Sequence, residues 1–412
     1  MNADWKKLNA VIDRFVKEGI VTGCGMRIFK DGEMVFNRST GVSTADGSRP
    51  FTADTRLRMH SMTKNFTCAA IMTLYDQGLF ALDDPIAEYL PEFANPMVCV
   101  SDTDISQVVP AADPITIRQL LSMRSGIPYW DMPGVPSEGI VQAEYLKMAQ
   151  KIASRVSGGE TNTLENLVKD IAKMPLCFQP GERWMYGLSL TVIGRLIEVL
   201  SGMKISDYMK KTLWEPLGMT KTCFVTQLQG SEQIGEVMIP AELAEPMGLN
   251  PDVISHPAGR EDVFCSRVDV LPGTNLGVEL PCGGLISTMN DIGRLFAMFA
   301  GGGELDGVRV LGRRTIDLMR TNQLTPEQLP DFAVMTNKGF GYGLGYRTML
   351  DPSDAGFYMP AGSFGWDGAS GCYGLANPDE KLAIVFAESS VPHHIIYTVP
   401  RVVAAMNADR NW

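Results

Sequence analysis

The first part of the chain alternates between helical and strand-like patterns of apolar side chains. Residues 4–17 have a helical period, which predicts an amphipathic helix with one apolar face. That face comprises Leu8, Val11, Ile12, Phe15 and Val16. Two short apolar runs, at 25–29 and 34–36, flank an Asp31-Gly32 turn, and this pattern predicts a β-hairpin.

The middle of the chain is mostly helical in pattern. Residues 61–77 contain neither glycine nor proline and stop at Gly78, so we expect a helix there. Similar patterns predict helices at 116–123 and 189–200. Residues 223–283 are rich in proline and glycine and poorly periodic, which indicates a long excursion over the surface.

The last third of the chain returns to strand patterns. Thr288 and Asp291 form a capping-box pattern that predicts the start of a helix. Three segments predict strands, at 340–349, 371–376 and 382–387. A final helix is expected to start near Thr398.

This order of elements predicts an α+β protein with two lobes. The simplest packing joins the terminal strands into one antiparallel sheet with flanking helices, from residues 1–80 and 284–412. Residues 81–283 then form a second, mostly helical lobe with long loops. A cleft between two such lobes is a natural site for a small molecule.

Composition and charge narrow the classes of function. The 412 residues are 45% apolar and 20% charged, as in a soluble globular protein with a sizeable core. The formal net charge of −11 argues against nucleic acid or an anionic membrane surface as a partner, because both need clustered lysine and arginine. No apolar run reaches the roughly 18 residues that span a bilayer.

Cysteine and histidine usage points to a reduced protein without metal. The eight cysteines are scattered singly with no C-x-x-C pair, and the N-terminal residues lack the apolar stretch of a signal peptide. None of the four histidines has metal-ligand spacing, so we expect no metal and no other cofactor. A cytoplasmic location is the working expectation, and the oligomeric state stays open.

Ser61 and Lys64 form the first motif that suggests chemistry. One helical turn apart, they share a face, with Cβ atoms about 5–6 Å apart. A helix N-terminus favours an oxyanion beside Ser61, and burial disfavours charge on Lys64, which can then act as a base. The spacing alone is weak, since Ser201 and Lys204 also match it. That second copy lies where a helix stops at Gly202 and lacks the helix-start context.

Several motifs in order support the first copy. The run 57–67 and its continuation to Pro85 resemble the nucleophile region of the serine β-lactamase and penicillin-binding-protein family, in particular its class C β-lactamase-like branch. Further matches follow at 115–126, 180–186, 283–288 and 340–346. The resemblance covers nearly the whole chain. It implies a β-lactamase/transpeptidase-like fold and an acyl-enzyme on Ser61.

Tyr186 matches the tyrosine of the family's second motif, Tyr-x-Asn, whose phenol shuttles a proton between nucleophile and leaving group. A phenol needs a nearby cation to act as a base, and Lys64 can supply it. Leu188 stands where the lactamases carry asparagine, so an amide contact to a substrate carbonyl is missing. Tyr-x-Leu in this spacing resembles the family VIII carboxylesterases.

The family's third motif, Lys-Thr-Gly or His-x-Gly, corresponds here to Trp366, Asp367 and Gly368. The resemblance implies that Gly368 lets the strand edge approach the substrate and that the Ala369 N–H joins the Ser61 N–H as the oxyanion hole. Trp366 replaces the cation that would grip a carboxylate, and it can stack on an apolar acyl or alcohol group. Trp-x-Gly also resembles the esterase branch.

Two further aromatic residues are candidates for the substrate site. Tyr129 and Trp130 fall where the family places a loop over the active site, so they either form an apolar wall or pack the helical lobe. His60 adjoins the nucleophile, but neighbouring residues at a helix start point apart, which disfavours a Ser-His pair. No G-x-S-x-G elbow occurs, and this disfavours an α/β-hydrolase.

We therefore expect a serine hydrolase that forms an acyl-enzyme on Ser61, with Lys64 and Tyr186 managing the proton. The first expected activity is a carboxylesterase on small apolar esters, with acyl transfer to a second alcohol or amine as a variant. The alternative is a D-amino-acid peptidase, amidase or β-lactamase, which needs a positive or amide-bearing group from elsewhere in the cleft. A non-catalytic binder or scaffold is a further alternative, and the joint presence of Ser61, Lys64, Tyr186 and Gly368 weighs against it.

Overall fold

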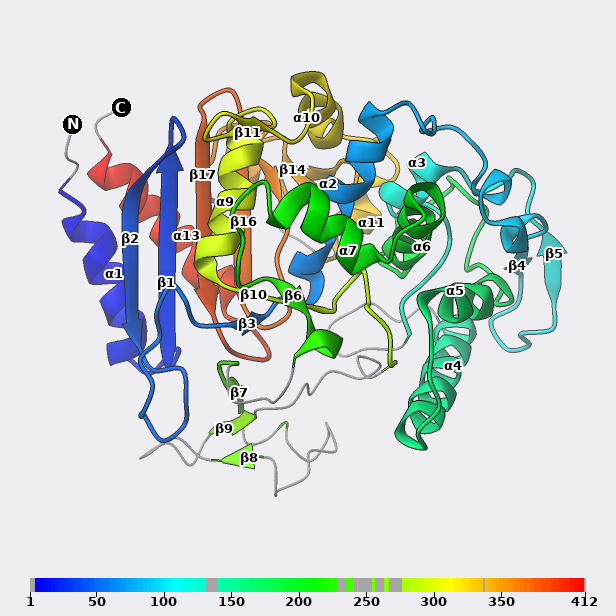
Figure 1. The fold of residues 1–412 in the computed structure, drawn as a ribbon, viewed down its shortest axis with the longest axis horizontal. Coiled ribbons are helices and arrows are strands. Elements are labelled where there is room, and N and C mark those ends of the chain that lie inside the picture. Colours follow the sequence, from blue (N-terminus) through cyan, green and yellow to red (C-terminus); the bar gives the residue numbers. More distant parts are fainter. Residues whose placement is uncertain are drawn as a thin grey trace.

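A seven-stranded antiparallel sheet built from both ends of the chain forms the centre of the fold (Figure 1). The computed structural model describes residues 4–130, 139–228, 234–240, 243, 254–255, 263–266, 276–335 and 338–410. In spatial order the strands are β13 (Phe340–Tyr342), β14 (Arg347–Met349), β15 (Phe364–Gly365), β16 (Cys372–Asn377), β17 (Leu382–Glu388), β1 (Gly23–Lys30) and β2 (Glu33–Gly41). This confirms the predicted α+β class with a sheet from the two chain ends.

The pairing of β17 with β1 brings the two ends of the chain into one sheet. Every residue of β17 is buried, as are the first six of β1, because helices cover both faces of the sheet. The predicted hairpin joins β1 to β2. Asp31 and Gly32 have φ angles of 54° and 85°, and two positive φ values give the turn geometry that matches strand twist.

Helices lie on both faces of the sheet (Figure 1). Helices α1 (Lys6–Lys17) and α13 (Ile395–Asp409) pack together on one face, and α9 (Met289–Ala300) contacts β1, β16 and β17 on the other. The Thr288 side chain caps α9 by accepting from the Asp291 N–H, as its sequence predicts. At Gly374 a Cβ would fall 2.4 Å from the Phe296 ring, so α9 lies directly on β16.

The ends of α1 and α13 lie side by side. Lys7 Nζ donates to the Ala408 carbonyl at 2.9 Å, and the Leu8 N–H donates to the Asp409 carboxylate at 2.9 Å. Figure 1 shows the two chain ends next to each other at the edge of the molecule.

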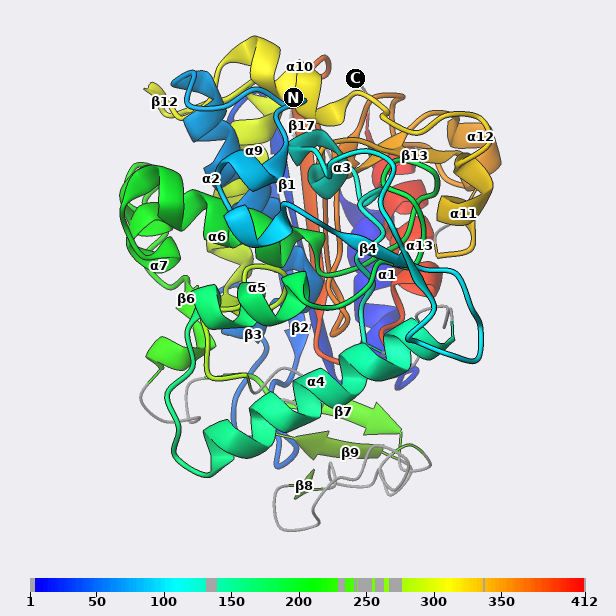
Figure 2. The same ribbon diagram turned by 90° about the vertical axis from the view of Figure 1, so that its right-hand side faces the viewer.

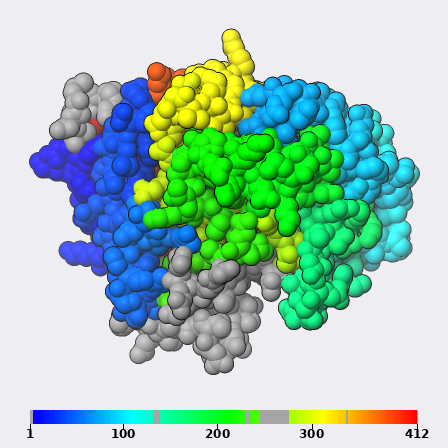
Figure 3. Space-filling model, viewed as in Figure 1, coloured from blue at the N-terminus to red at the C-terminus, as the bar shows by residue number. Residues whose placement is uncertain are grey.

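The middle of the chain forms a mostly helical region beside the sheet (Figure 2). Its helices are α2 (Thr63–Asp76), α3 (Ile117–Leu121), α4 (Ile140–Ser157), α5 (Leu164–Ala172), α6 (Ser189–Ser201) and α7 (Ile205–Met209). Buried α2 packs against α6 and α7. In the space-filling view, cyan and green residues form the right-hand part of this face and blue N-terminal residues the left (Figure 3).

Short ladders and helices complete the fold. The ladders are β3 (Leu57–Arg58), β10 (Leu285–Ser287) and β6 (Cys223–Phe224) in one sheet, β4 (Met97–Cys99) with β5 (Val108–Pro110), and β11 (Glu304–Leu305) with β12 (Val308–Arg309). The remaining short helices are α10 (Arg313–Arg320), α11 (Leu329–Ala333) and α12 (Pro352–Ala355).

The predicted surface excursion at 223–283 lies partly outside the described residues. Within it, β7 (Val237–Pro240), β9 (Val263–Ser266) and β8 (Ile254–Ser255) form a small sheet. The Met238 N–H donates to the Ser389 carbonyl at 2.9 Å, which fastens β7 to the segment after β17. Backbone pairing therefore gives this stretch strands that its irregular sequence pattern does not reveal.

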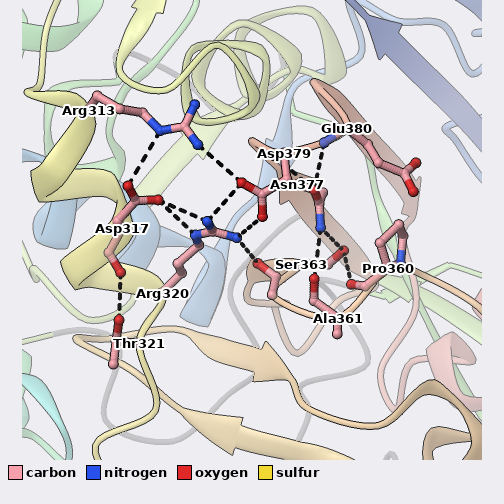
Figure 4. Close-up of polar contacts among 11 residues, drawn as sticks. Arg313, Asp317, Arg320, Thr321, Pro360, Ala361, Ser363, Asn377, Asp379 and Glu380 are labelled. Carbon is pink, nitrogen blue, oxygen red and sulfur yellow. Dashed lines mark hydrogen bonds and ion pairs between the residues drawn. The ribbon is translucent and has the colours of Figure 1, made fainter.

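An ion-pair network fastens α10 to the turn between β16 and β17 (Figure 4). The Arg320 guanidinium donates to both carboxylate oxygens of Asp379, at 2.6 and 3.0 Å, and to Asp317 at 2.9 Å. Arg313 also pairs with Asp379, at 3.1 Å. Asn377 closes the turn by accepting from the Asp379 N–H at 3.0 Å.

We predict that Asp379→Asn lowers the free energy of unfolding at pH 7, because it removes the negative charge that pairs with Arg313 and Arg320. The loss should be only about 0.5–1 kcal/mol, because solvent screens this half-exposed network. Hydrogen bonding to Arg320 holds the pKa of Asp379 below its usual value. Its stabilisation is therefore present above the ordinary carboxyl pKa and is lost as pH falls through the lowered one. Denaturant unfolding at pH 7 and pH 3 checks this. Asp102→Asn, at an exposed carboxylate, is the control, and an equal loss in both variants would contradict the prediction.

Candidate active site

Ser61 lies in a tight turn just before α2. Residues His60–Met62 form a 3-10 turn and α2 begins at Thr63, so the predicted helix from 61 starts two residues later in regular α form. His60 has a φ of 42°, a left-handed backbone conformation that is uncommon for residues other than glycine. The Met59 N–H donates to the Leu285 carbonyl at 2.9 Å, so the β3–β10 ladder holds this turn.

Lys64 is wholly buried and its amine has three oxygen partners. Nζ lies 3.1 Å from Ser61 Oγ, 2.9 Å from the Tyr129 hydroxyl and 2.7 Å from the Cys282 carbonyl. No carboxylate pairs with Lys64 among the described residues. The carbonyl can only accept, so one N–H points to it, whereas each hydroxyl can donate or accept. Lys64 can therefore exchange a proton with Ser61.

Tyr186 lies beside this amine, with its hydroxyl bonded elsewhere. Lys64 Nζ is 4.7 Å from the centroid of the Tyr186 ring, and the Tyr186 hydroxyl accepts a hydrogen bond from Trp366 Nε1 at 3.0 Å. In the described part of the chain, no hydrogen bond joins this hydroxyl directly to Ser61 or Lys64. Tyr186 of the second motif thus lies next to Lys64, and its hydroxyl is held by the Trp366 indole.

A close approach of two loops places Tyr186 next to Tyr129. At Gly187 a Cβ would fall 1.9 Å from the Ile127 carbonyl oxygen, so only glycine fits between the loops. The two tyrosine rings are 5.3 Å apart as a result.

Tyr129 is predicted from sequence as part of an apolar wall, but its hydroxyl is a partner of Lys64. Burial, and next the neighbouring Cys282, raise the pKa of Tyr129 well above its ordinary value, so it stays a neutral phenol. Tyr129 therefore holds the amine rather than acting as a base. Sequence reasoning missed this role, and also the Cys282 carbonyl, because contacts 65 and 218 residues away in the chain leave no local pattern.

The third motif lies against the turn that carries Ser61. At Gly368 a Cβ would fall 2.1 Å from the Met59 carbonyl oxygen, so the turn between β15 and β16 touches the backbone just before Ser61. The backbone N–H groups of Ser61 and Ala369, both half-buried, donate to no acceptor among the described residues. Two free donors beside Ser61 suit the predicted oxyanion hole.

The other predicted substrate residues are buried in the structure. Trp366 is 3% exposed and contacts the Tyr186 ring at 5.4 Å. Trp130 packs edge-on against Tyr129, and Leu188 is fully buried at the start of α6. All three shape the site's apolar interior.

The described residues show no cluster of three or more side chains suited to a metal ion. None of the described helices is both long enough and apolar enough to cross a bilayer.

An α+β fold that holds a serine beside a buried lysine, with a tyrosine ring next to that lysine, fits the class of serine hydrolases. The chain belongs to the Beta-lactamase family, whose model matches residues 8–394. It is 29% identical over 400 residues to Protein Rv1367c of Mycobacterium tuberculosis, covering 95% of this chain and 91% of that protein.

Two further relatives have named activities. Esterase EstB of Burkholderia gladioli is 27% identical over 379 residues, covering 89% of this chain and 85% of EstB. The solved structure of EstCE1, a hydrolase with promiscuous acyltransferase activity, has the same fold, with a TM-score of 0.75, 20% identity and 97% of each chain covered.

We predict that Gly368→Ala slows the labelling of Ser61 by a fluorophosphonate at least ~100-fold, because a clash with the Met59 carbonyl must displace either Ser61 or the turn between β15 and β16. Gly283→Ala is the control, since its Cβ would meet only ordinary contacts, the nearest at 3.7 Å. Labelling followed by intact-mass spectrometry gives both rates. Equal rates for the two variants would contradict the prediction.

Tyr129→Phe keeps the ring and removes one of the three oxygen partners of Lys64. We expect labelling of Ser61 to slow about 10- to 100-fold, the worth of one hydrogen bond to a charged or buried polar group. The matched control is Tyr145→Phe, because the Tyr145 hydroxyl is buried with no hydrogen-bond partner among the described residues. Thermal unfolding of both variants separates a loss of reactivity from a loss of fold.

Proposed function

We propose that this serine hydrolase is a carboxylesterase that acts on small, fairly apolar esters through an acyl-enzyme on Ser61. The observation that carries the proposal is the fully buried Lys64 amine, 3.1 Å from Ser61 Oγ and free of any carboxylate among the described residues. A buried amine that no carboxylate holds in its charged form can take part in proton transfer.

Acylation begins when Ser61 Oγ attacks the ester carbonyl carbon and its proton passes to the pair formed by Lys64 and Tyr186. The carbonyl oxygen becomes an oxyanion, and the free N–H groups of Ser61 and Ala369 stabilise it. Collapse of this adduct breaks the bond to the alcohol oxygen, and the alcohol leaves with the proton from the pair.

Deacylation repeats these steps with water as the nucleophile. Water gives a proton to the same pair as it adds to the acyl carbon. When the bond to Ser61 Oγ breaks, the proton returns to Ser61 and the carboxylic acid is released.

Two substitutions in the family motifs favour esters over lactams and peptides. Buried Leu188 offers no amide to a substrate carbonyl, and Trp366 offers no charge to a substrate carboxylate. The cation nearest to Trp366, Arg347, lies 4.6 Å from the ring and is paired with Asp367. The similarity to Esterase EstB supports the same choice.

Acyl transfer to a second alcohol is a variant of the same cycle, in which that alcohol replaces water. The aromatic side chains around Ser61 favour it because they limit the water near the acyl-enzyme. EstCE1, which shares the fold, is a hydrolase with promiscuous acyltransferase activity.

A substrate panel tests the proposal. We expect turnover of p-nitrophenyl acetate and butyrate, little turnover of lactams and D-amino acid amides, and no ester turnover by Ser61→Ala. Intact-mass spectrometry should show a phosphonate adduct that Ser61→Ala lacks, and no lasting penicilloyl adduct. A stable penicilloyl adduct would favour the peptidase or lactamase alternative, and the absence of both adducts would favour a non-catalytic binder.

A further inference from the structure

Arg347 is a buried cation next to the aromatic side chains of the active site. Its side chain is 9% exposed, and the guanidinium lies 4.6 Å from the centroid of Trp366, 5.5 Å from that of Tyr373 and 5.9 Å from that of Phe340. It comes from β14, and its ion-pair partner Asp367 belongs to the third motif.

The charge on Arg347 is permanent. Burial alone would lower the pKa of Arg347, but the charge of Asp367, together with its hydrogen bond and the neighbouring Tyr373 and Tyr186, outweighs burial, so the pKa is raised. A buried ion pair is weak evidence for stability, because its desolvation cost can match its attraction and apolar residues of similar size often replace it without loss. The position of the pair next to Trp366 therefore calls for another explanation.

Trp366 connects this pair to the proposed base. Its indole contacts Arg347 and Tyr186, and its N–H donates to the Tyr186 hydroxyl at 3.0 Å. A cation over an indole draws electron density from the ring, which makes the N–H a stronger donor. A stronger donor stabilises negative charge on the phenol oxygen.

We propose that Arg347 is a positioning residue that acts on Tyr186 through the indole of Trp366. In the third motif, Trp366 stands where the family carries a cation. Here Arg347, paired with Asp367, places a positive charge behind the indole instead, out of reach of the substrate. Asp367 limits the strength of that charge and keeps Arg347 in place. The inference rests on the proposed function, in which Tyr186 takes part in accepting the Ser61 proton.

Other titratable groups also face Tyr186. They are Lys64 from α2, Tyr129 from the loop after α3, and Tyr342 from β13. None of these groups changes in the variants below, so a shift in the pH dependence reports on the Arg347–Asp367 pair.

The test measures the rate of Ser61 labelling by a fluorophosphonate from pH 5 to 10. Arg347→Met removes the positive charge, and we expect the midpoint of the rising limb to move up by about 1 pH unit. Asp367→Asn, which is isosteric, leaves the cation unneutralised, and we expect the midpoint to move down by a similar amount. In the double variant the midpoint returns close to that of the parent, and Arg347→Lys also stays close to it.

Shifts of opposite sign separate an electrostatic role from a structural one, because loosened packing would slow labelling at every pH without moving the midpoint. Unchanged midpoints in a parent enzyme that is labelled and hydrolyses esters would overturn this inference and leave the proposed function intact. A parent that is neither labelled nor active on esters would overturn both. If Arg347→Met does not fold, the downward shift of Asp367→Asn still decides the matter.

Discussion

One buried nitrogen ties the two halves of the molecule together. Placing the Lys64 amine in the interior without a carboxylate is costly unless its hydrogen bonds are satisfied. Of the three oxygens that satisfy them, Ser61 Oγ lies one helical turn away, and those of Tyr129 and Cys282 are 65 and 218 residues away along the chain. The turn before α2, the loop after α3 and the segment before β10 must all be in place at once. Thr67 helps to hold the last of these segments. Its hydroxyl donates to the Pro281 carbonyl at 2.6 Å and so anchors the segment that carries Cys282.

Around that nitrogen the protein places a buried cluster of aromatic side chains. Tyr129, Tyr186 and Trp366 contact one another in sequence, and the low polarity of such a cluster strengthens every remaining charge and hydrogen bond. The same cluster removes the polar groups with which related hydrolases would grip an amide or a carboxylate. The proposed reactivity and the proposed preference for apolar esters therefore depend on one set of side chains.

The sequence predicts the parts of this arrangement that have local patterns. Hairpins, helices and the Ser61–Lys64 spacing follow from periodicity and turn chemistry, and the remaining motifs follow from family resemblance. It does not predict the role of Tyr129, the Cys282 carbonyl or the Arg347–Asp367 pair, because these depend on contacts across the fold. The strands within 223–283 also escape prediction, since the pairing of β7 and β8 with β9 and of β6 with β10, and not apolar periodicity, creates them.

The indole of Trp366 also fixes the orientation of the Tyr186 hydroxyl. An indole nitrogen can only donate, so in its bond with Trp366 the Tyr186 oxygen can only accept. The phenol's own hydrogen must therefore point away from Trp366 Nε1. The Tyr186 hydroxyl thus has one orientation instead of two. The direction in which it can donate its proton is therefore set before a substrate binds.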